Sequence, residues 1–580
     1  MSSLFSSRPR PGLQSDRLSH PLSRRRFVEG LALGTAALSL GLPRFSLAQS
    51  SVAPPYPSVP EMHGPHQELV VGEQHVNFTG QVRTAITVNG SLPAPVLRFR
   101  EGEAFRFTVR NTLSEDTSIH WHGFVLPAAM DGVPGFSFHG IAPGESYHYE
   151  FPVKQSGTYW YHSHSAMQEA RGLYGAIIIE PREPEPFQYD RDHVVLLSDW
   201  SDEDPHRILA KLKSQSSYYN QHPRTVADFF RDVKAKGWSA AYADRKMWGE
   251  MRMTPTDLAD VSAATYTYLV NGATPASNWT GLFKPGEKVR LRFINAASMT
   301  YFDIRIPGLK MTVVAADGQY VEPVEIDEFR LAVAETLDVI VEPREGAYTI
   351  FAQSMDRSGY ARATLATAAG LSAAVPALDP RPLLSMADMG HDMDGMEGMD
   401  MEAQKHPASE NNPGVDMQAM MPMARLDDPG IGLRDEDRAG EGRKVLTYAD
   451  LRSAFPDPDG REPVRDIELH LTGHMERYVW SFDGIPFASA EPVRLKYGER
   501  VRLILVNDTM MTHPIHLHGM WSDLEDEDGN FLVRKHTISM PPGTRRTYRV
   551  TADALGRWAY HCHLLMHMDG GMFREVRVEA

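Results

Sequence analysis

Short stretches of alternating apolar and polar residues recur along the chain, and Gly, Pro, Asn or Asp bound most of them. Alternation with period two predicts half-buried β-strands joined by turns. One block leads through a Gly-Glu turn at 102–103 to a strand that ends at Asn111, and similar blocks end at Asn295 and Asn507. Three copies of one block predict three related β-domains, each a Greek-key sandwich or barrel.

We therefore predict an all-β fold with domains at residues 52–185, 186–368 and 441–580. Within the second domain, the stretches 205–214 and 227–236 have helical periodicity, which predicts a helical insertion. Residues 369–440 form a different kind of segment, because ten Met lie between 386 and 423 among Asp, Glu and Gly. Few residues there suit a core, so we predict a mobile, acidic, Met-rich linker.

The first 48 residues have the features of an export signal. Arg24-Arg25-Arg26-Phe27 precede an apolar run of about 13 residues, too short to span a bilayer. Paired Arg followed by Phe is typical of a twin-arginine signal, which directs folded proteins across the membrane. We predict export to the periplasm by the twin-arginine machinery. No later segment approaches 18 apolar residues, so we expect no integral membrane protein.

Charge and cysteine content exclude two further classes of protein. The formal net charge is −16, whereas a nucleic-acid-binding protein needs a basic face, so we expect no nucleic acid partner. The single Cys, Cys562, excludes an intrachain disulfide framework. Cys562 is therefore either buried and inert or part of the chemistry.

Histidines at metal-ligand spacing are the strongest chemical signal in the sequence. On a strand, His-x-His places both imidazoles on one face, about 6–7 Å apart, which suits adjacent metal ions or one shared centre. Ten of the 24 His fall in four clusters near equivalent ends of the first and last repeats: His120 and His122; His162 and His164; His513, His516 and His518; His561, His563 and His567.

The last cluster joins two kinds of ligand. Strand alternation puts Cys562 on one face and its two His neighbours on the other. His513, Cys562 and His567, with Met572 as a weak axial ligand, describe a blue-copper electron-transfer site. Zinc also accepts Cys and His, but it has no use for a redox relay. The remaining His suit a three-copper cluster: His120, His122, His162, His164, His516, His518, His561 and His563.

These four clusters resemble the signature blocks of the multicopper oxidases, and the three repeats cover nearly the whole chain after the signal. The twin-arginine signal, the Met-rich stretch and the run from His561 to Phe573 look most like the periplasmic copper-resistance protein A branch of that family. The resemblance implies three cupredoxin-like domains, of which the second binds no copper. It also implies four coppers per chain: one type 1, one type 2 and two type 3.

Roles follow from the resemblance for the individual residues. Electrons would enter at the type 1 copper and pass through Cys562 to His561 and His563, and four of them reduce O₂ to two waters. Type 1 ligands would be His513, Cys562, His567 and Met572; type 2 ligands His120 and His516; type 3 ligands His122, His162, His164, His518, His561 and His563.

Proton delivery to O₂ needs a carboxylate near the cluster. Asp131 matches the family's position for one, but it also suits the turn Met130-Asp131-Gly132, and the two interpretations stay open. Some relatives have an acid directly after the last type 1 His, where this chain has Met568. The next residue, Asp569, is the available substitute.

Three functions fit these features. The first is an O₂-dependent oxidase that converts Cu(I) to Cu(II) and so protects the cell; the second is a laccase that oxidises phenols. The third is copper sequestration by the Met-rich segment, with catalysis incidental. Thioethers are soft ligands for Cu(I), which favours the first over the second. A storage protein needs no cysteine bridge between metal sites, which places the third last.

Overall fold

The computed structural model describes residues 59–390, 412–438 and 440–580. The predicted signal, 1–48, lies outside the described residues. So do four methionines of the Met-rich stretch, namely Met393, Met396, Met399 and Met401. In the described ranges, no helix has the length and apolar character needed to cross a membrane.

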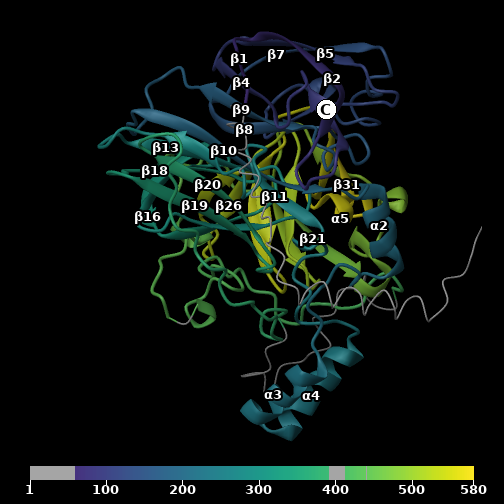
Figure 1. Cartoon of the computed structure of the whole chain (residues 1–580). Coiled ribbons are helices and arrows are strands. Elements are labelled where there is room, and N and C mark those ends of the chain that lie inside the picture. The colour runs from purple at the N-terminus through teal and green to yellow at the C-terminus, as the bar shows by residue number, and fades with distance from the viewer. Residues whose placement is uncertain (1–58, 391–411, 439) are drawn as a thin grey trace, which may run out of the picture. The chain divides into compact units, whose positions relative to one another are not determined.

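Residues 61–180 form a first sandwich of two sheets (Figure 1). The sheet orders are β1-β4-β9-β8-β6 and β3-β2-β5-β7. The strands are β1 (Glu61–His63), β2 (His66–Val76), β3 (Arg83–Val88), β4 (Ala94–Arg100), β5 (Ala104–Asn111), β6 (His120–His122), β7 (Ser146–Pro152), β8 (Gly157–His162) and β9 (Tyr174–Glu180).

Residues 191–366 form a second sandwich, with sheet orders β11-β10-β13-β18-β15-β16 and β12-β20-β19-β14-β17. Its strands are β10 (Arg191–Ser201), β11 (Tyr266–Val270), β12 (Trp279–Leu282), β13 (Val289–Asn295), β14 (Phe302–Arg305), β15 (Met311–Ala316), β16 (Gln319–Ile326), β17 (Glu328–Leu331), β18 (Thr336–Val341), β19 (Ala347–Ser354) and β20 (Tyr360–Ala366).

Residues 466–579 form a third sandwich, with sheet orders β22-β21-β24-β29-β26-β27 and β23-β31-β30-β25-β28. These orders match those of the second sandwich strand for strand, as the internal repeat predicts. The elements are β21 (Asp466–His474), β22 (Val479–Phe482), β23 (Val493–Lys496), β24 (Arg500–Asn507), β25 (His513–Leu517), β26 (Ser522–Glu525), β27 (Phe531–Lys535), β28 (Thr537–Met540), β29 (Arg545–Thr551), β30 (Gly556–Cys562), α5 (Leu565–Asp569) and β31 (Phe573–Glu579).

The repeated Asn has one structural role in all three sandwiches. Its side-chain amide donates a hydrogen bond to a backbone carbonyl of another segment: Asn111 to Ile141 O (2.7 Å), Asn295 to Leu331 O (3.0 Å) and Asn507 to Met540 O (2.8 Å). The repeated Glu also has one role in all three copies. Its carboxylate accepts a hydrogen bond from the backbone N–H three residues before it and so closes the turn. The three copies thus share turn chemistry as well as strand order.

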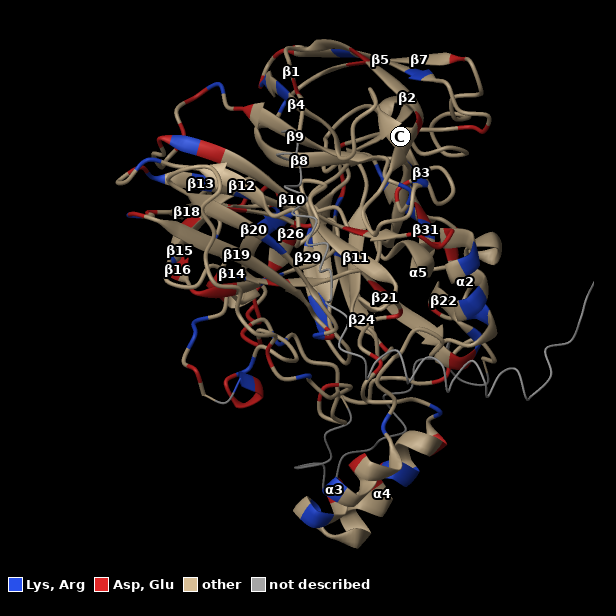
Figure 2. Ribbon diagram, in the orientation of Figure 1, with Lys and Arg blue, Asp and Glu red and all other residues tan. Residues whose placement is uncertain are grey.

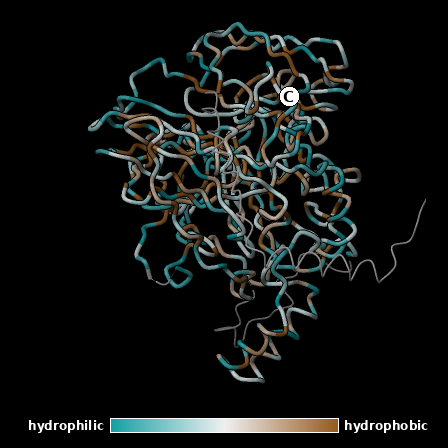
Figure 3. Tube along the Cα trace, viewed as in Figure 1, coloured by the Kyte–Doolittle hydropathy of each residue, from teal (hydrophilic) through white to brown (hydrophobic). Residues whose placement is uncertain are grey.

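Buried apolar side chains form the core of the sandwiches. Figures 2 and 3 mark the charged residues and the hydropathy of each position along the backbone. In β5, for example, Phe105, Phe107 and Val109 are buried, whereas Arg106 and Arg110 are exposed. The largest buried side chains are Trp121, Trp160, Trp480 and Trp558. The alternation read from the sequence therefore corresponds to inward and outward faces of real strands.

The insertion between β10 and β11 contains α2 (Pro205–Ser214), α3 (Val226–Lys236) and α4 (Trp238–Glu250). The first two were expected from periodicity, and the third was not. Asp204 caps α2 by accepting the N–H groups of His206 and Arg207, and Thr225 and Asp228 form a capping box on α3. In Figure 1, α3 and α4 lie together, apart from the sheets.

The described flanks of the Met-rich segment are held against the sandwiches. Met389 and Leu433 are fully buried, and Met423 forms a parallel bridge with Thr544. Asp416 accepts the N–H of Met475 in a 2.6 Å hydrogen bond. Parts of both flanks, 369–390 and 412–438, are therefore packed against other segments, although Leu371, Leu383 and Met423 are exposed. The mobility of the linker stays a prediction.

Candidate metal centre

The strands that carry the predicted ligands are equivalent neighbours in the first and third sandwiches. β6 pairs with β8, so that His120 lies opposite His162, and β25 pairs with β30, so that His516 lies opposite His561. Pairing at these positions brings ligands from four separate sequence blocks to the ends of two sheets. Antiparallel register sets these pairs, and His164, His518, His563 and His567 lie just beyond the strand ends.

The thiol-containing group is compact and buried. The Nδ1 atom of His513 lies 3.5 Å from Cys562 Sγ, and the Nδ1 atom of His567 lies 3.9 Å from it. The two Nδ1 atoms are 3.0 Å apart. Met572 is also fully buried, and its backbone N–H and C=O bond to His567 and Cys562. The predicted type 1 residues are thus adjacent.

Both imidazoles of this group are held from behind by oxygen atoms. His513 Nε2 lies 2.7 Å from Thr509 Oγ1, and His567 Nε2 lies 2.7 Å from Asp260 Oδ2. The Tyr478 hydroxyl also donates to Asp260 (3.1 Å). These contacts leave the Nδ1 atoms directed at the sulfur, which is the arrangement that metal-binding histidines need. Sequence reasoning missed Asp260, which belongs to the helical insertion and follows no motif.

The other eight histidines gather into overlapping groups whose ligand atoms lie within 4.8 Å of one another. Nε2 of His561 lies 3.0 Å from Nε2 of His518 and 3.3 Å from Nε2 of His164. The groups of predicted ligands are His122, His162 and His563; His164, His518 and His561; and His120, His516 and His518. Residues of the first and third sandwiches therefore build this cluster together.

Several nitrogens in the cluster are buried without a hydrogen-bond partner among the described residues: His120 Nε2, His122 Nδ1 and Nε2, His162 Nε2, His516 Nε2 and His563 Nε2. Buried polar atoms in native proteins are rarely unsatisfied. Burial, and then neighbouring imidazoles, hold the pKa values of His122 and His162 well below the usual value. Neutral imidazoles with free nitrogens that converge are what copper ions require, so these residues fit the predicted metal.

Asp131 lies between two of the predicted ligands. Its Oδ2 is 2.9 Å from Nδ1 of His518, and its backbone oxygen is 2.7 Å from Nδ1 of His120. The next residue, Gly132, has a φ of 79°, and a Cβ there would lie 1.9 Å from Ile119 O. Asp131 therefore occupies a tight turn and also contacts the cluster, so the two interpretations of this residue are compatible. A role in proton delivery stays a proposal.

A second carboxylate at the cluster is Glu169, which sequence reasoning missed. Its Oε2 lies 2.6 Å from Nδ1 of His162, and burial, then Asp199, raises its pKa well above the usual value. Asp569, the substitute considered from the sequence, is instead half-exposed and forms an ion pair with Lys213. The only signal for Glu169 was an acid seven residues after a ligand histidine, which is too common to single out.

His536 is a third residue that the sequence did not reveal. It stands alone between β27 and β28, outside any His-x-His pattern. Its ligand atom nevertheless lies within 4.8 Å of those of His122 and His516.

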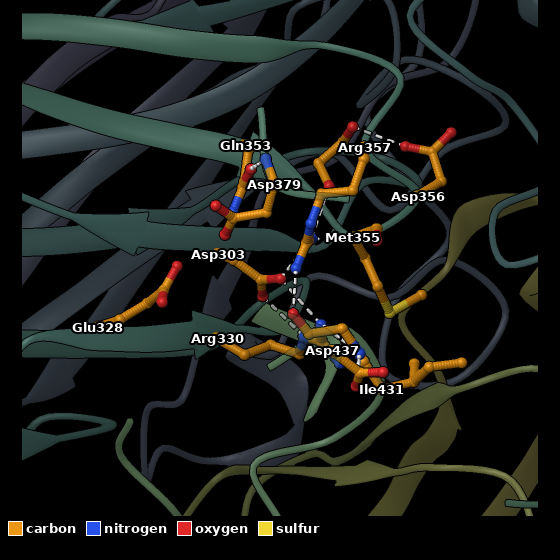
Figure 4. Close-up of polar contacts among 12 residues, drawn as sticks. Asp303, Glu328, Arg330, Gln353, Met355, Asp356, Arg357, Asp379, Ile431 and Asp437 are labelled. Carbon is orange, nitrogen blue, oxygen red and sulfur yellow. Dashed lines mark hydrogen bonds and ion pairs between the residues drawn. The ribbon is translucent and has the colours of Figure 1, made fainter. Parts of the chain in front are cut away.

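The second sandwich has no comparable group: among the described residues, none of the sets of converging His, Cys, Asp or Glu ligand atoms includes a residue of 186–368. At the corresponding strand ends it carries ion pairs (Figure 4). Asp303 on β14 contacts Arg330 (2.7 Å) and Arg357 (2.6 Å), and Arg357 also donates to Gly432 O.

Comparison with known proteins agrees with this geometry. Family profiles described as multicopper oxidase match residues 70–184, 191–372 and 461–580. The chain therefore belongs to the multicopper oxidase family, and its cofactor is copper.

Within that family, the chain is similar to proteins named copper resistance protein A. The one from Escherichia coli is 63% identical over an alignment of 607 positions, gaps included. The alignment covers 96% of this chain and 99% of that protein. The one from Pseudomonas syringae pv. tomato is 62% identical with the same coverage. Among solved structures, Fet3p, described as a multicopper oxidase that functions in iron import, has a TM-score of 0.63 at 20% identity. It covers 89% of this chain with 91% of its own, and it shows the shared fold.

Proposed function

We propose that this chain is a periplasmic copper-resistance oxidase that couples the one-electron oxidation of Cu(I) to Cu(II) to the four-electron reduction of O₂ to water. Family membership and the similarity to copper resistance protein A support an oxidase concerned with copper. The observation that carries the proposal is the segment 561–563, in which one peptide bears the buried thiol of Cys562 and two cluster imidazoles. A storage protein gains nothing from that connection.

The proposed complement is four coppers per chain. Copper supplies reversible one-electron chemistry, which side chains alone do not have. His513, Cys562 and His567 would hold the type 1 ion, with Met572 as axial ligand. His120 and His516 would hold the type 2 ion, and His122, His162, His164, His518, His561 and His563 the type 3 pair.

We infer that Cu(I) approaches the type 1 site from the side of Asp260. Asp260 contacts His567, and Asp257 lies close enough to it that burial and the Asp260 charge raise the pKa of Asp257 to about 8. A carboxyl whose pKa is raised to about 8 is largely protonated at neutral pH, and a cation bound beside the pair would favour its ionised form. The described Met-rich flank also reaches this region, because Asp416 bonds to Met475 three residues before Tyr478. Soft thioethers and a carboxylate would suit Cu(I) better than a phenol.

Asp260→Asn tests the substrate. Asn keeps the size of the side chain but removes the charge, so Cu(I) oxidation at low Cu(I) should fall more than phenol oxidation. Loss of the hydrogen-bond partner of His567 lowers both activities alike, by about 10–100-fold. Steady-state oxygen consumption with Cu(I) and with a phenol measures both activities. A selective loss with Cu(I) supports the proposal, whereas a selective loss with the phenol favours the laccase alternative.

The Met-rich segment is tested separately. Replacing Met393, Met396, Met399 and Met401 by Leu keeps apolar bulk and removes four thioethers without disturbing the buried Met389. Cu(I) oxidation should fall at low copper, and phenol oxidation should persist. Loss of bound Cu(I) with unchanged oxidation rates would instead favour the sequestration alternative.

Export is tested through the signal. Replacing Arg24 and Arg25 by Lys should leave a folded precursor in the cytoplasm, because the twin-arginine route depends on the Arg pair. Cell fractionation followed by immunoblotting measures this. Normal arrival in the periplasm would show that another route is used.

A further inference from the structure

His536 lies beside the predicted copper cluster at the start of β28. The pairing of β25 with β28 sets His516 opposite Thr537, so His536 is one residue from a predicted ligand's partner. Its backbone oxygen accepts a hydrogen bond from Nδ1 of His516 at 2.6 Å. The residue is buried, with 1% of its surface exposed.

One side of the His536 imidazole is fixed by oxygen atoms. Its Nδ1 lies 3.0 Å from Thr537 Oγ1 and 3.6 Å from Asp317 Oδ2. Asp317 in turn accepts the backbone N–H groups of His536 and Thr537 and pairs with Lys535 at 3.0 Å. A carboxylate or hydroxyl behind Nδ1 is the arrangement that orients metal-binding histidines and leaves Nε2 for the ion.

The other side of the ring faces the cluster. Nε2 of His536 is buried and has no hydrogen-bond partner among the described residues, and the same is true of Nε2 of His516 and both nitrogens of His122. Ligand atoms of the three residues lie within 4.8 Å of one another. The ring centres of His536 and His122 are 4.7 Å apart.

A purely structural role for His536 explains less. A core histidine normally satisfies both ring nitrogens, because a buried nitrogen without a hydrogen-bond partner destabilises the fold. The ring is also closely confined, since a Cβ at Gly123 would lie 2.5 Å from its Cδ2. The position therefore holds one nitrogen rigidly toward the cluster and leaves it unpaired unless an ion is bound.

We propose that His536 is a further copper ligand, whose Nε2 adds a third imidazole to the copper bound by His516. That ion is the predicted type 2 copper, for which the family resemblance supplies only two protein ligands. Cu(II) favours tetragonal sites with several nitrogen ligands, so a third imidazole is chemically suitable. The inference rests on the proposed copper cluster but is independent of whether Cu(I) or a phenol is the substrate.

The direct test uses the copper-loaded wild-type protein. Pulsed electron paramagnetic resonance of the type 2 signal counts the imidazoles whose remote nitrogens couple to the ion. Three coupled imidazoles support the proposal. Two would overturn it, whatever the oxidase activity toward either substrate.

A variant gives the second measurement. His536→Gln should lose the type 2 ion about 10-fold more readily to a chelator and shift the hyperfine splitting of its signal. His139→Gln, at an exposed histidine of the first sandwich, is the matched control and should change neither. If His536 only fills the core, His536→Gln will lower the stability of the copper-free chain and leave copper retention and the spectrum of the loaded chain unchanged, and that result would refute the proposal. Type 1 colour reports independently that the proposed centre is intact.

Discussion

The second and third sandwiches have the same strand order but opposite uses for the same strand ends. In the third, β25 and β30 present His513, His516, His561 and Cys562. In the second, the matching strands β14 and β19 present Asp303 and Gln353, with Arg330 and Arg357 beside them (Figure 4). The same strand order is thus compatible with either kind of site. A few side chains at the strand ends decide whether a sandwich binds metal or binds its neighbouring segment.

The two ends also differ in how they satisfy buried polar groups. In the second sandwich each group meets an opposite charge: burial alone would raise the pKa of Asp303, but Arg330 and Arg357 lower it below its usual value. In the third, the imidazoles of His516 and His563 face other imidazoles, and their pKa values fall because burial, and then the neighbouring imidazoles, favour the neutral form. The ion pairs at the strand ends of the second sandwich satisfy each other. The neutral imidazoles of the third leave nitrogen atoms free for a metal ion.

The largest expected effect is the loss of the thiol at the metal-binding end. Cys562→Ser should abolish both the blue charge-transfer band and oxidase activity, while most of the histidine-bound copper stays. Visible absorption and copper analysis measure these. No other Cys exists in the chain, so a surviving blue band would rule out the assignment of Cys562.

Acid should separate the two sandwiches in the copper-free chain. Burial lowers the pKa of His536 and His561 to about 4, from an ordinary 6.5. Between these values the unfolded chain binds more protons, so stability falls as pH drops from 6.5 to 4, by about 3 kcal/mol for each residue. The contribution of Asp303, whose pKa is lowered, is lost only as pH falls further, through its folded pKa.

Hydrogen exchange followed by mass spectrometry can resolve this difference. At pH 5, corrected for intrinsic rates, β25 and β30 should lose protection before β14 and β19. Bound copper should delay the loss, because the metal competes with protons for the imidazoles. Equal loss in both sandwiches would contradict the comparison.

Breaking the ion pairs of Asp303 with Arg330 and Arg357 in the second sandwich should lower stability but leave the metal centre unchanged. Asp303→Asn leaves two buried guanidinium groups short of a counter-charge, so the free energy of unfolding should fall by roughly 3–5 kcal/mol. Copper content at low temperature should be unchanged. Glu150→Gln, which removes the exposed pair with Arg106, is the control and should cost less than about 1 kcal/mol. Copper loss in Asp303→Asn would mean that the two ends are coupled.

The smallest expected effect concerns Met572. Met572→Leu keeps an apolar side chain of similar size, so copper binding should persist, but removal of the axial thioether should change the potential of the type 1 site. Redox titration of the blue band measures this. An unchanged potential would show that Met572 is not an axial ligand.

The features that could be predicted from the sequence are those that produce a local, periodic pattern of residues. Strand alternation, the repeated Asn and the His-x-His spacing are all short-range patterns, and each corresponds to a feature of the structure. α4 escaped because its apolar residues do not line one face: Trp238 and Tyr242 are exposed while Ala241 and Trp248 are buried. The burial of Met389 and Leu433 in the flanks of the Met-rich segment could not be predicted, because composition does not show which buried positions other segments offer.

Residues that act through long-range contacts had no such pattern. Asp260, Glu169 and His536 are single polar residues whose neighbours in sequence carry no period. Asp260 reaches His567 across 307 positions of the chain, and only the fold brings them together. Family resemblance supplied the ligand set, but it did not supply these three.

The shared cluster also has a consequence for biosynthesis. Asp131 and His518, which touch at 2.9 Å, are 387 residues apart, and His164 and His561 are 397 apart. A nascent chain that stops before residue 513 holds only four of the eight cluster histidines, namely His120, His122, His162 and His164. Closing a loop of nearly 400 residues between the two ligand sets costs entropy, but this cost rises only slowly with loop length. Docking of the sandwiches can therefore offset it. The proposed cluster can therefore bind its full set of copper ions only after the whole chain has been synthesised and the first and third sandwiches have docked. Copper content then reports that both steps are complete.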